Sequence, residues 1–301
     1  MFHYVNSKKL ICMNSNKSIH KHKLDGITGD RLNRLHDSPP MLFYRGIEPN
    51  ELLTRPTVAI VGSRKMSAYG RAVTEKIATE LANAGVVIIS GLALGVDSAA
   101  HRMAVEAGTP TIAVLAGGLD NIHPSSHTDL ARSILSANGA LVSEYPEGMP
   151  PMAHQFVARN RIIAALADCV VITEAAIGSG SLHTAAFAID LGKPVLAVPG
   201  PINSSLSEGT NQLIKTGAEL ITNVDDILNA MHLVKKDRQQ NLFGNNNSET
   251  AILIAISKGI TDGSMIQEAS NLDSIIFAQT LTMLEINGKI RALGGNMWAL
   301  K

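Results

Sequence analysis

The sequence predicts an α/β fold, with a mostly parallel sheet covered by helices on both faces and a small C-terminal winged-helix module. From Thr57 to about Leu228, short β-branched runs alternate with helical patterns, which is typical of parallel sheets. A polar stretch at residues 231–248 then precedes a segment with its own apolar pattern. With 301 residues, 45% of them hydrophobic, the chain is long enough for two domains with buried cores.

The expected strands are short apolar runs between helical segments. In chain order they are Thr57–Val61, Val86–Ser90, Pro110–Leu115, Ala140–Ser143, Asp168–Thr173 and Pro194–Val198. Between the first two runs, Val73, Ile77 and Leu81 recur every four residues and predict a helix with one apolar stripe toward the sheet. Gly85 is expected to end that helix.

Composition divides the chain into four segments. Residues 1–30 are polar and basic and predict a flexible tail, and residues 31–230 form the sheet domain. Residues 231–248 are expected to be a linker, and residues 249–301 the C-terminal module.

The C-terminal module has a helical pattern over residues 273–287, then a strand, a Gly-Gly turn and a second strand over residues 288–300. This order predicts a winged helix. The module has four basic and five acidic residues, which favours protein contact or dimer support over duplex binding, because phosphate contacts need cations.

Charge along the chain limits where a nucleic acid could bind. The net charge is zero, and residues 41–230 carry twelve Lys/Arg against seventeen Asp/Glu, whereas residues 1–36 carry seven against two. Any nucleic-acid site must therefore be a local basic cluster. The candidate cations are Arg64, Lys65, Arg71, Arg159 and Arg161.

The two cysteines, Cys12 and Cys169, are far apart in the sequence, so we expect neither a disulfide framework nor a zinc site. No apolar run has membrane-spanning length, and the N-terminus lacks a signal-peptide pattern. We therefore expect a cytoplasmic protein without membrane, metal or cofactor.

Two segments predict a site for single-stranded nucleic acid. Ala59–Lys65 ends an apolar strand at Gly62 and then offers the hydroxyl of Ser63 and the guanidinium of Arg64, a combination that suits a phosphate. Phe156–Ile163 places an aromatic ring shortly before two arginines, so that a base can stack while flanking phosphates are neutralised.

Glycine-rich turns follow several of the expected strands. In an open α/β sheet such turns meet at the carboxyl ends of the strands, where helix N-termini attract anions. They include Gly62–Arg64, Ser90–Gly95 with Gly91, Ala116–Gly118, and Gly178–Ser181 with Ser179, Gly180 and Ser181. Their repetition predicts a broad anion-binding rim.

Signatures of catalysis are missing from the sequence. There is no P-loop, and Gly178-x-Gly180 lacks the third glycine of a dinucleotide fingerprint. Asp97 and His101 could face the rim as a general base, but we expect Asp97 to cap a helix and His101 to pack or hydrogen-bond locally. Glu174 is either a rim carboxylate or a strand-end group, with the second favoured.

An ordered set of motifs resembles the DNA-processing protein A (DprA/Smf) family. They are Gly62-Ser63-Arg64 with Tyr69-Gly70, Ser90–Ala93 to Asp97 and His101, Phe156–Ile163, Ser179–Ser181, and Pro199-Gly200. The resemblance extends from about Leu32 to Leu228 and includes the C-terminal module. It implies an extended Rossmann-like sheet and a non-catalytic homodimer that binds single-stranded DNA. It also implies a role in loading the recombinase RecA during natural transformation and recombination.

The resemblance also implies roles for individual residues. Arg64 would hold a backbone phosphate with Ser63, Phe156 would stack or support a base, Arg159 and Arg161 would flank the strand, and Asn160 would fix the loop or hydrogen-bond a nucleotide. The full set of predicted DNA-binding residues is Gly62, Ser63, Arg64, Gly91, Phe156, Arg159, Asn160, Arg161, Ser179, Gly180 and Ser181.

This chain departs from the family pattern at several cations. The family usually has Arg at the position of Leu94, Pro at Val157, Arg at Ala158, and often a basic residue within Met152–Gln155. Because each lost phosphate contact lowers both affinity and its salt dependence, we expect weak or length-dependent DNA binding.

Two other functions stay open. One is a nucleotide-ligand sensor or phosphoribohydrolase of the lonely-guy-related Rossmann group, although Glu174–Ser181 lacks the Pro-Gly-Gly-x-Gly-Thr-x-x-Glu run of those enzymes. The other is a structural adaptor that acts through the winged helix and a dimer face.

Overall fold

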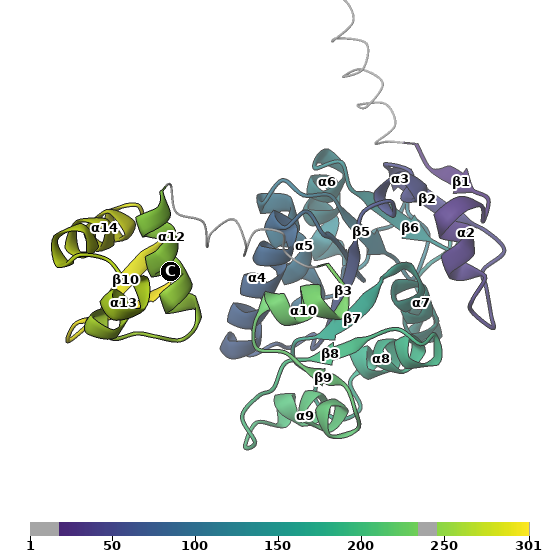
Figure 1. Ribbon diagram of the computed structural model, residues 1–301. Helices are drawn as coiled ribbons and strands as arrows, with labels where there is room; N and C mark the ends of the chain where they lie inside the picture. The colour runs from purple at the N-terminus through teal and green to yellow at the C-terminus, as the bar shows by residue number, and fades with distance from the viewer. Residues whose placement is uncertain (1–17, 234–245, 301) are drawn as a thin grey trace, which may run out of the picture. The chain divides into compact units, whose positions relative to one another are not determined.

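The computed structural model describes residues 18–233 and 246–300 (Figure 1). Its internal contacts divide the chain into two compact units with the boundary between His232 and Leu233. None of the helices within the described ranges combines the length and hydropathy that a bilayer span requires.

The first unit contains a nine-stranded sheet in the order β1-β2-β6-β5-β4-β3-β7-β8-β9. Strands β3 to β9 pair in parallel, whereas β1 pairs with β2, and β2 with β6, in antiparallel fashion. The predicted mostly parallel sheet is therefore confirmed. The strands are β1 His20–His22, β2 Leu42–Gly46, β3 Thr57–Val61, β4 Val87–Ser90, β5 Thr111–Val114, β6 Ala140–Ser143, β7 Cys169–Ile172, β8 Val195–Ala197 and β9 Glu219–Leu220.

Helices cover both faces of this sheet, with α4, α5 and α6 along one face and α2, α7 and α8 along the other (Figure 1). Ala59 and Val61 of the central strand β3 belong to the same buried cluster as residues 162–166 of α7. The helices are α2 Gly26–Leu32, α3 Pro49–Leu52, α4 Ala68–Asn83, α5 Val96–Glu106, α6 Thr128–Ser136, α7 Ala153–Leu166, α8 Gly180–Asp190, α9 Glu208–Lys215 and α10 Val224–Ala230.

Helix α4 shows why local sequence determines these elements. The Ser67 hydroxyl caps it by accepting a hydrogen bond from the Gly70 amide at 3.0 Å. Ile77 and Leu81 of the predicted stripe are buried against the sheet. The helix ends before Gly85, whose φ of +80° is a conformation that glycine adopts without steric cost.

Residues 18–30 differ from the prediction of a flexible tail. His20–His22 forms β1 on the edge of the sheet, where the His20 ring lies 5.2 Å from that of Tyr44, and α2 follows. Leu32, at the end of α2, is fully buried in the cluster that includes α7. The tail prediction is therefore wrong for residues 18–30, and the first seventeen residues lie outside the described part of the chain.

Over residues 246–300, the C-terminal unit shows three helices and an antiparallel hairpin, the element order that the winged-helix prediction requires. They are α12 Asn247–Ser257, α13 Gly263–Ser270, α14 Ser274–Ile286, β10 Ile290–Gly294 and β11 Met297–Leu300. This unit has its own core, which includes Ile252, Phe277 and Leu284. Helix α12 begins inside the predicted linker, of which residues 234–245 lie outside the described residues.

Candidate nucleic-acid interface

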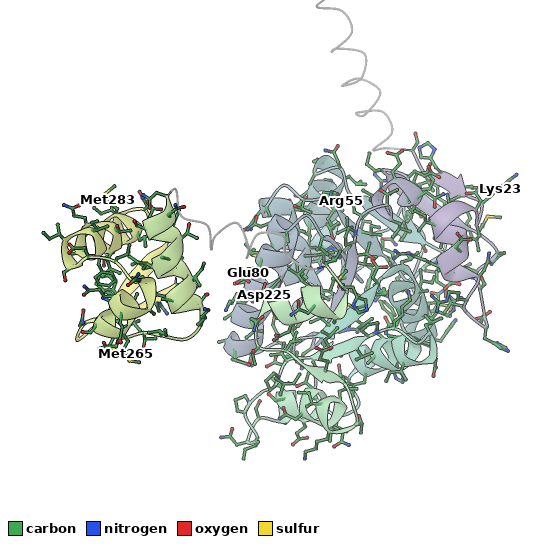
Figure 2. The ribbon with its side chains drawn as sticks, viewed as in Figure 1. Lys23, Arg55, Glu80, Asp225, Met265 and Met283 are labelled. Carbon is green, nitrogen blue, oxygen red and sulfur yellow. The ribbon has the colours of Figure 1, made fainter. Side chains whose placement is uncertain are left out.

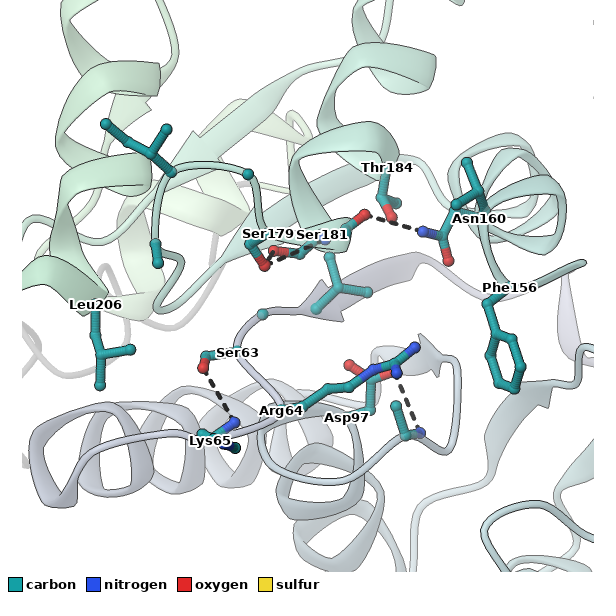
Figure 3. A pocket seen from close by; sticks show the side chains of 18 of the residues that line it. Ser63, Arg64, Lys65, Asp97, Phe156, Asn160, Ser179, Ser181, Thr184 and Leu206 are labelled. Atoms are coloured by element: carbon teal, nitrogen blue, oxygen red, sulfur yellow. Dashed lines mark hydrogen bonds between the residues drawn. The ribbon is translucent and has the colours of Figure 1, made fainter. Parts of the chain in front are cut away.

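A cavity of about 590 Å³ lies at the carboxyl ends of β3 and β7 (Figure 3). The chain winds from β3 toward β4 on one side, and β7 lies on the other side of β3, so this is the topological switch point where α/β sheets bind ligands. Of the predicted site residues, Gly91 and Arg161 do not line the cavity. The others do, namely Gly62, Ser63, Arg64, Phe156, Arg159, Asn160, Ser179, Gly180 and Ser181.

The loop after β3 is fixed by its backbone. The Ser63 amide donates to the Glu174 carbonyl oxygen at 2.7 Å, and the Ser63 carbonyl oxygen accepts from the Val96 amide at 3.1 Å. A Cβ at Gly62 would lie 2.7 Å from the Glu174 carbonyl oxygen, so only glycine fits there. The Ser63 hydroxyl oxygen accepts from the Lys65 amide at 3.1 Å, which orients the hydroxyl beside the cavity.

Arg64 and Phe156 form a cation–π pair at the cavity. The Arg64 guanidinium carbon lies 5.3 Å from the centroid of the Phe156 ring. Arg64 is exposed and Phe156 is half-buried, with the His123 ring packed edge-on at 5.6 Å. The predicted phosphate-binding cation and the predicted stacking ring are therefore brought together, although they come from segments far apart in the sequence.

Arg159 is a buried internal cation. It is 4% exposed, and its Nη1 donates to the carbonyl oxygens of Gly91, at 2.6 Å, and Val114. Burial lowers the Arg159 pKa to about 10, against the attraction of the buried Asp97 carboxylate. Arg159 thus borders the cavity, but its guanidinium donates to carbonyl oxygens at the ends of β4 and β5. It does not lie free to flank a DNA strand, as the sequence predicts.

Gly91 and Asp97 complete this buried arrangement. A Cβ at Gly91 would lie 2.5 Å from the Arg159 guanidinium, so glycine is required for packing. The Asp97 carboxylate accepts from the amides of Gly91 at 3.0 Å and Ala93 at 3.4 Å. Asp97 therefore holds the loop before α5 and is not the N-cap that the sequence predicts; that position is Gly95. Burial raises the Asp97 pKa, and the Arg159 charge opposes this shift.

Arg161 also has a structural place. It is 7% exposed, donates to Glu144 Oε2 at 2.6 Å, and lies 3.6 Å from Asp37 Oδ2. Because it does not line the cavity, the prediction that it flanks the bound strand is not supported by its position.

The N-terminus of α8 faces the cavity. Ser179 is its N-cap, and the hydroxyl oxygens of Ser179 and Ser181 lie 2.9 Å apart (Figure 3). One turn later Thr184 also lines the cavity, and its hydroxyl is buried, 1% exposed, with no hydrogen-bond partner among the described residues. Hydroxyls at a helix N-terminus favour an anion there.

Asn160 links α7 to α8. Its Nδ2 donates to the Gly180 carbonyl oxygen at 3.0 Å, and its Oδ1 accepts from Arg159 Nε at 3.2 Å. Of the two roles expected for Asn160, this geometry supports fixing the loop.

The side chains considered for catalysis are held in internal contacts. His101 is fully buried, its Nδ1 lies 2.8 Å from the Thr111 hydroxyl oxygen, and burial lowers its pKa to about 3. The Glu174 carboxylate accepts from the amide and the hydroxyl of Ser67, at 2.8 and 2.5 Å. Glu174 is therefore a strand-end group, as favoured from the sequence.

Sequence reasoning missed several residues that line the cavity, among them Ile177, Thr184 and Leu206. Helical spacing from Ser181 could have indicated Thr184, whereas nothing local in the sequence indicated the exposed Ile177. Of the remaining candidate cations, Lys65 lines the cavity, but Arg71 does not and lies 3.6 Å from Glu75. Val157, which replaces the usual proline, is exposed at the cavity.

Comparison with known proteins places this site in a family. The sequence model described as DNA recombination-mediator protein A matches residues 25–232. Protein Smf of Escherichia coli is 37% identical over 274 residues, covering 88% of this chain and 73% of that protein. The DNA processing protein DprA of Streptococcus pneumoniae is 43% identical over 197 residues, covering 65% of this chain and 68% of that protein. The chain spans about half, 51%, of the putative DprA of Mycobacterium tuberculosis strain H37Rv, at 42% identity.

Solved structures agree. The S. pneumoniae DprA structure superposes with a TM-score of 0.66 at 39% identity, covering 73% of this chain and 77% of that one. A Helicobacter pylori DNA processing protein A, described for its single-stranded DNA binding mode, superposes with a TM-score of 0.63 at 35% identity, covering 72% and 97%. The predicted resemblance is confirmed: this chain belongs to the DNA recombination-mediator protein A (DprA/Smf) family.

Proposed function

We propose that this chain binds single-stranded DNA in the cavity at the β3–β7 switch point and acts in DNA uptake and recombination. The observation that carries the proposal is the Arg64–Phe156 cation–π pair beside the N-terminus of α8. An aromatic face, a guanidinium and a helix N-terminus together suit one unstacked base and its flanking phosphates. The single-stranded DNA binding described for the H. pylori relative supports the same function.

Individual roles follow from the contacts. Ser63, Ser179, Ser181 and the amides at the start of α8 would hold a backbone phosphate, because they present hydroxyl and N–H groups at the cavity. Arg64 and Lys65 are the exposed cations among the described lining residues, and would neutralise phosphates. Arg159, Asn160, Arg161 and Gly91 would act indirectly, by fixing the loops that present these groups.

Single strands are favoured over duplex for two reasons. An unpaired base can turn out of its stack to reach Phe156 without the cost of breaking a base pair. The surrounding residues 41–230 carry more acidic than basic residues, so they offer no extended basic surface to a duplex.

The proposed role is binding without catalysis. Asp97, His101 and Glu174 are buried and engaged within the chain, which leaves none of them placed as a general base toward a nucleotide. Incubation with nucleoside monophosphates should therefore release no free base. Release would favour a phosphoribohydrolase instead.

Substitution of Arg64 tests the cavity directly. With two exposed cations in contact with phosphates, the logarithm of single-strand affinity should fall with the logarithm of salt concentration with a slope of about −1.4. Arg64→Ala should weaken binding and reduce that slope to about −0.7. Fluorescence anisotropy of labelled oligonucleotides at several salt concentrations measures both quantities.

The matched control is Arg71→Ala, which removes an exposed cation near the same loop that does not line the cavity. It should leave affinity and slope close to those of the unchanged protein. Equal effects of the two substitutions, or equal affinity for duplex and single strand, would refute binding in this cavity.

The family resemblance extends the proposal to RecA loading by a cytoplasmic homodimer. Light scattering gives the oligomeric state. The rate of RecA filament formation on a strand covered by single-strand-binding protein tests loading, and no acceleration by this protein would exclude it.

A further inference from the structure

Both ends of the loop that carries Arg64 and Lys65 are fastened to one residue, Glu174. At the start of the loop, the Ser63 amide donates to the Glu174 backbone carbonyl oxygen at 2.7 Å. At its end, the Glu174 carboxylate accepts from the Ser67 amide at 2.8 Å and from the Ser67 hydroxyl at 2.5 Å. The two exposed cations therefore stand on a short loop whose backbone is held on both sides of them.

The Glu174 side chain is buried, which makes its charge costly unless hydrogen bonds satisfy it. It is 2% exposed and forms no ion pair with another described residue. The two bonds from Ser67 satisfy it at the N-terminus of α4, where a negative charge is favoured. An apolar side chain would fill the same space at a lower free-energy cost, so the carboxylate indicates a need for two acceptors directed at Ser67.

Glu174 also begins the loop on the opposite side of the cavity. It follows β7 and leads through residues 176–178, which line the cavity, to Ser179, the N-cap of α8. Figure 3 shows Arg64 and Lys65 across the cavity from Ser179. One residue therefore holds the cations in place relative to the start of α8, which is the other candidate phosphate site.

We propose that Glu174 is a positioning residue for DNA binding, which sets the spacing between the Arg64–Lys65 cations and the N-terminus of α8 without contacting the strand itself. This inference rests on the proposed binding of single-stranded DNA in the cavity. Successive phosphates are joined covalently, so two phosphate sites act together only when the spacing between them is fixed before the strand arrives. Loss of the anchoring should therefore lower affinity even though every group that contacts DNA remains present.

Gly70 gives an independent way to disturb the same contact. It lies in the first turn of α4, and a Cβ there would lie 2.5 Å from Glu174 Oε2. Because this atom ends a flexible side chain, Gly70→Ala would move the carboxylate away from Ser67 while every residue of the contact is kept. Alanine is also the better helix former, which offsets part of the cost to stability.

Three variants of the full-length chain test the positioning role by fluorescence anisotropy. Glu174→Leu removes both acceptors and Gly70→Ala displaces them, so each should lower single-strand affinity severalfold and make the salt slope less steep than about −1.4. Glu174→Gln is the matched control, because it removes the same charge as Glu174→Leu while its amide can still accept from and donate to Ser67. It should keep most of the affinity. Equal losses in Glu174→Leu and Glu174→Gln would overturn the positioning role.

Cleavage by trypsin measures the anchoring without DNA. The bonds after Arg64 and Lys65 lie within the anchored loop, and cleavage there requires the loop to open locally. Glu174→Leu and Gly70→Ala should be cut there severalfold faster than the unchanged chain. The internal control is cleavage after Lys23, which is exposed on the first unit (Figure 2). Equal acceleration after Lys23 would indicate a loss of overall stability and would contradict local anchoring.

A double substitution separates failure of the positioning role from failure of the proposed DNA site. In an Arg64→Ala background, Glu174→Leu should lower affinity by a smaller factor than in the unchanged chain, because one of the groups that it positions is already absent. If Arg64→Ala weakens binding but Glu174→Leu and Gly70→Ala do not, the positioning role is wrong and the DNA site stands. If Arg64→Ala itself has no effect, the proposed site fails and the positioning role fails with it.

Discussion

Arg159 acts through the residues it holds, at the edge of the proposed DNA site. Its guanidinium donates to two strand-end carbonyl oxygens and faces the buried Asp97. Arg159→Met leaves Asp97 buried without its counter-charge, so the free energy of unfolding should fall by about 3–5 kcal/mol. Urea denaturation measures this loss.

A second variant separates this structural role from DNA contact. The double substitution Arg159→Met with Asp97→Asn should cost less than the sum of the two single changes, because the pair is removed together. If the losses in the free energy of unfolding are additive, Arg159 and Asp97 do not act as a pair. If Arg159→Met lowers DNA affinity without changing stability, Arg159 contacts phosphate directly.

His101 gives the protein a pH dependence that can be assigned to one residue. Its pKa is about 3 in the folded chain, because burial disfavours the charged ring, against 6.5 as the ordinary value. The unfolded chain therefore binds more protons between these two values. The His101 contribution is fully present above pH 6.5 and is lost progressively toward pH 3, at no more than about 1.4 kcal/mol per pH unit.

His101→Gln should flatten the decline of the unfolding free energy between pH 6.5 and 4, relative to the unchanged chain. The slope is the relevant measurement, since the substitution itself alters stability at all pH values. His183→Gln, an exposed histidine on α8, serves as the control. A slope that His101→Gln leaves unchanged would mean that the ring is charged or mobile in the folded protein.

At the scale of elements, the start of α8 offers a test of ligand approach without a change in stability. A Cβ at Gly180 would meet no atom within 4 Å, in contrast to Gly62 and Gly91. Gly180→Ala should therefore leave the melting temperature unchanged or slightly raised, because alanine is the better helix former. If a phosphate binds at these amides, the added methyl group should lower single-strand affinity severalfold.

Gly178→Ala, in the same turn, is the control for that experiment, because it separates an effect on stability from an effect on DNA affinity. Gly178 has a φ of +77°, so a substitution there should reduce stability through backbone strain. Unchanged DNA affinity in Gly180→Ala would remove the α8 N-terminus from the binding site and leave Arg64 and Phe156 as its centre.

The elements also show how far the sequence could be read. Strands β3 and β6 have the predicted bounds, because each is a β-branched or apolar run buried throughout. Strands β1, β2 and β9 escaped prediction. Strands β1 and β9 are two or three residues long and become strands only through their neighbours, whereas β2 precedes the alternating strand–helix pattern that begins at Thr57. Nor could local spacing indicate that Arg159 and Arg161 are buried, since their partners are distant in the chain: Asp97, Glu144 and Asp37.

On the scale of the whole molecule, net charge gives DNA no long-range attraction. The total is zero and residues 41–230 are mildly acidic. Association with a strand should therefore depend on short-range contacts in the cavity and lack strong electrostatic steering. The family's usual arginine at Leu94 and basic residue near Met152 would change this balance, and both positions are exposed here.

The side-chain hydrogen bonds of Asn160 bear on whether the proposed site distinguishes one base from another. An asparagine amide is the group that most often reads adenine, through two hydrogen bonds. Here its nitrogen already donates to the Gly180 carbonyl oxygen and its oxygen already accepts from Arg159. Apart from the buried Asp97 carboxylate and apolar side chains such as Ile177 and Leu206, the described lining offers hydroxyls, amides, cations and one ring face, which suit the phosphates and base faces that all four nucleotides share. Under the proposed function, the protein would bind single-stranded DNA of any base sequence with similar affinity, whether the DNA comes from a related or an unrelated cell.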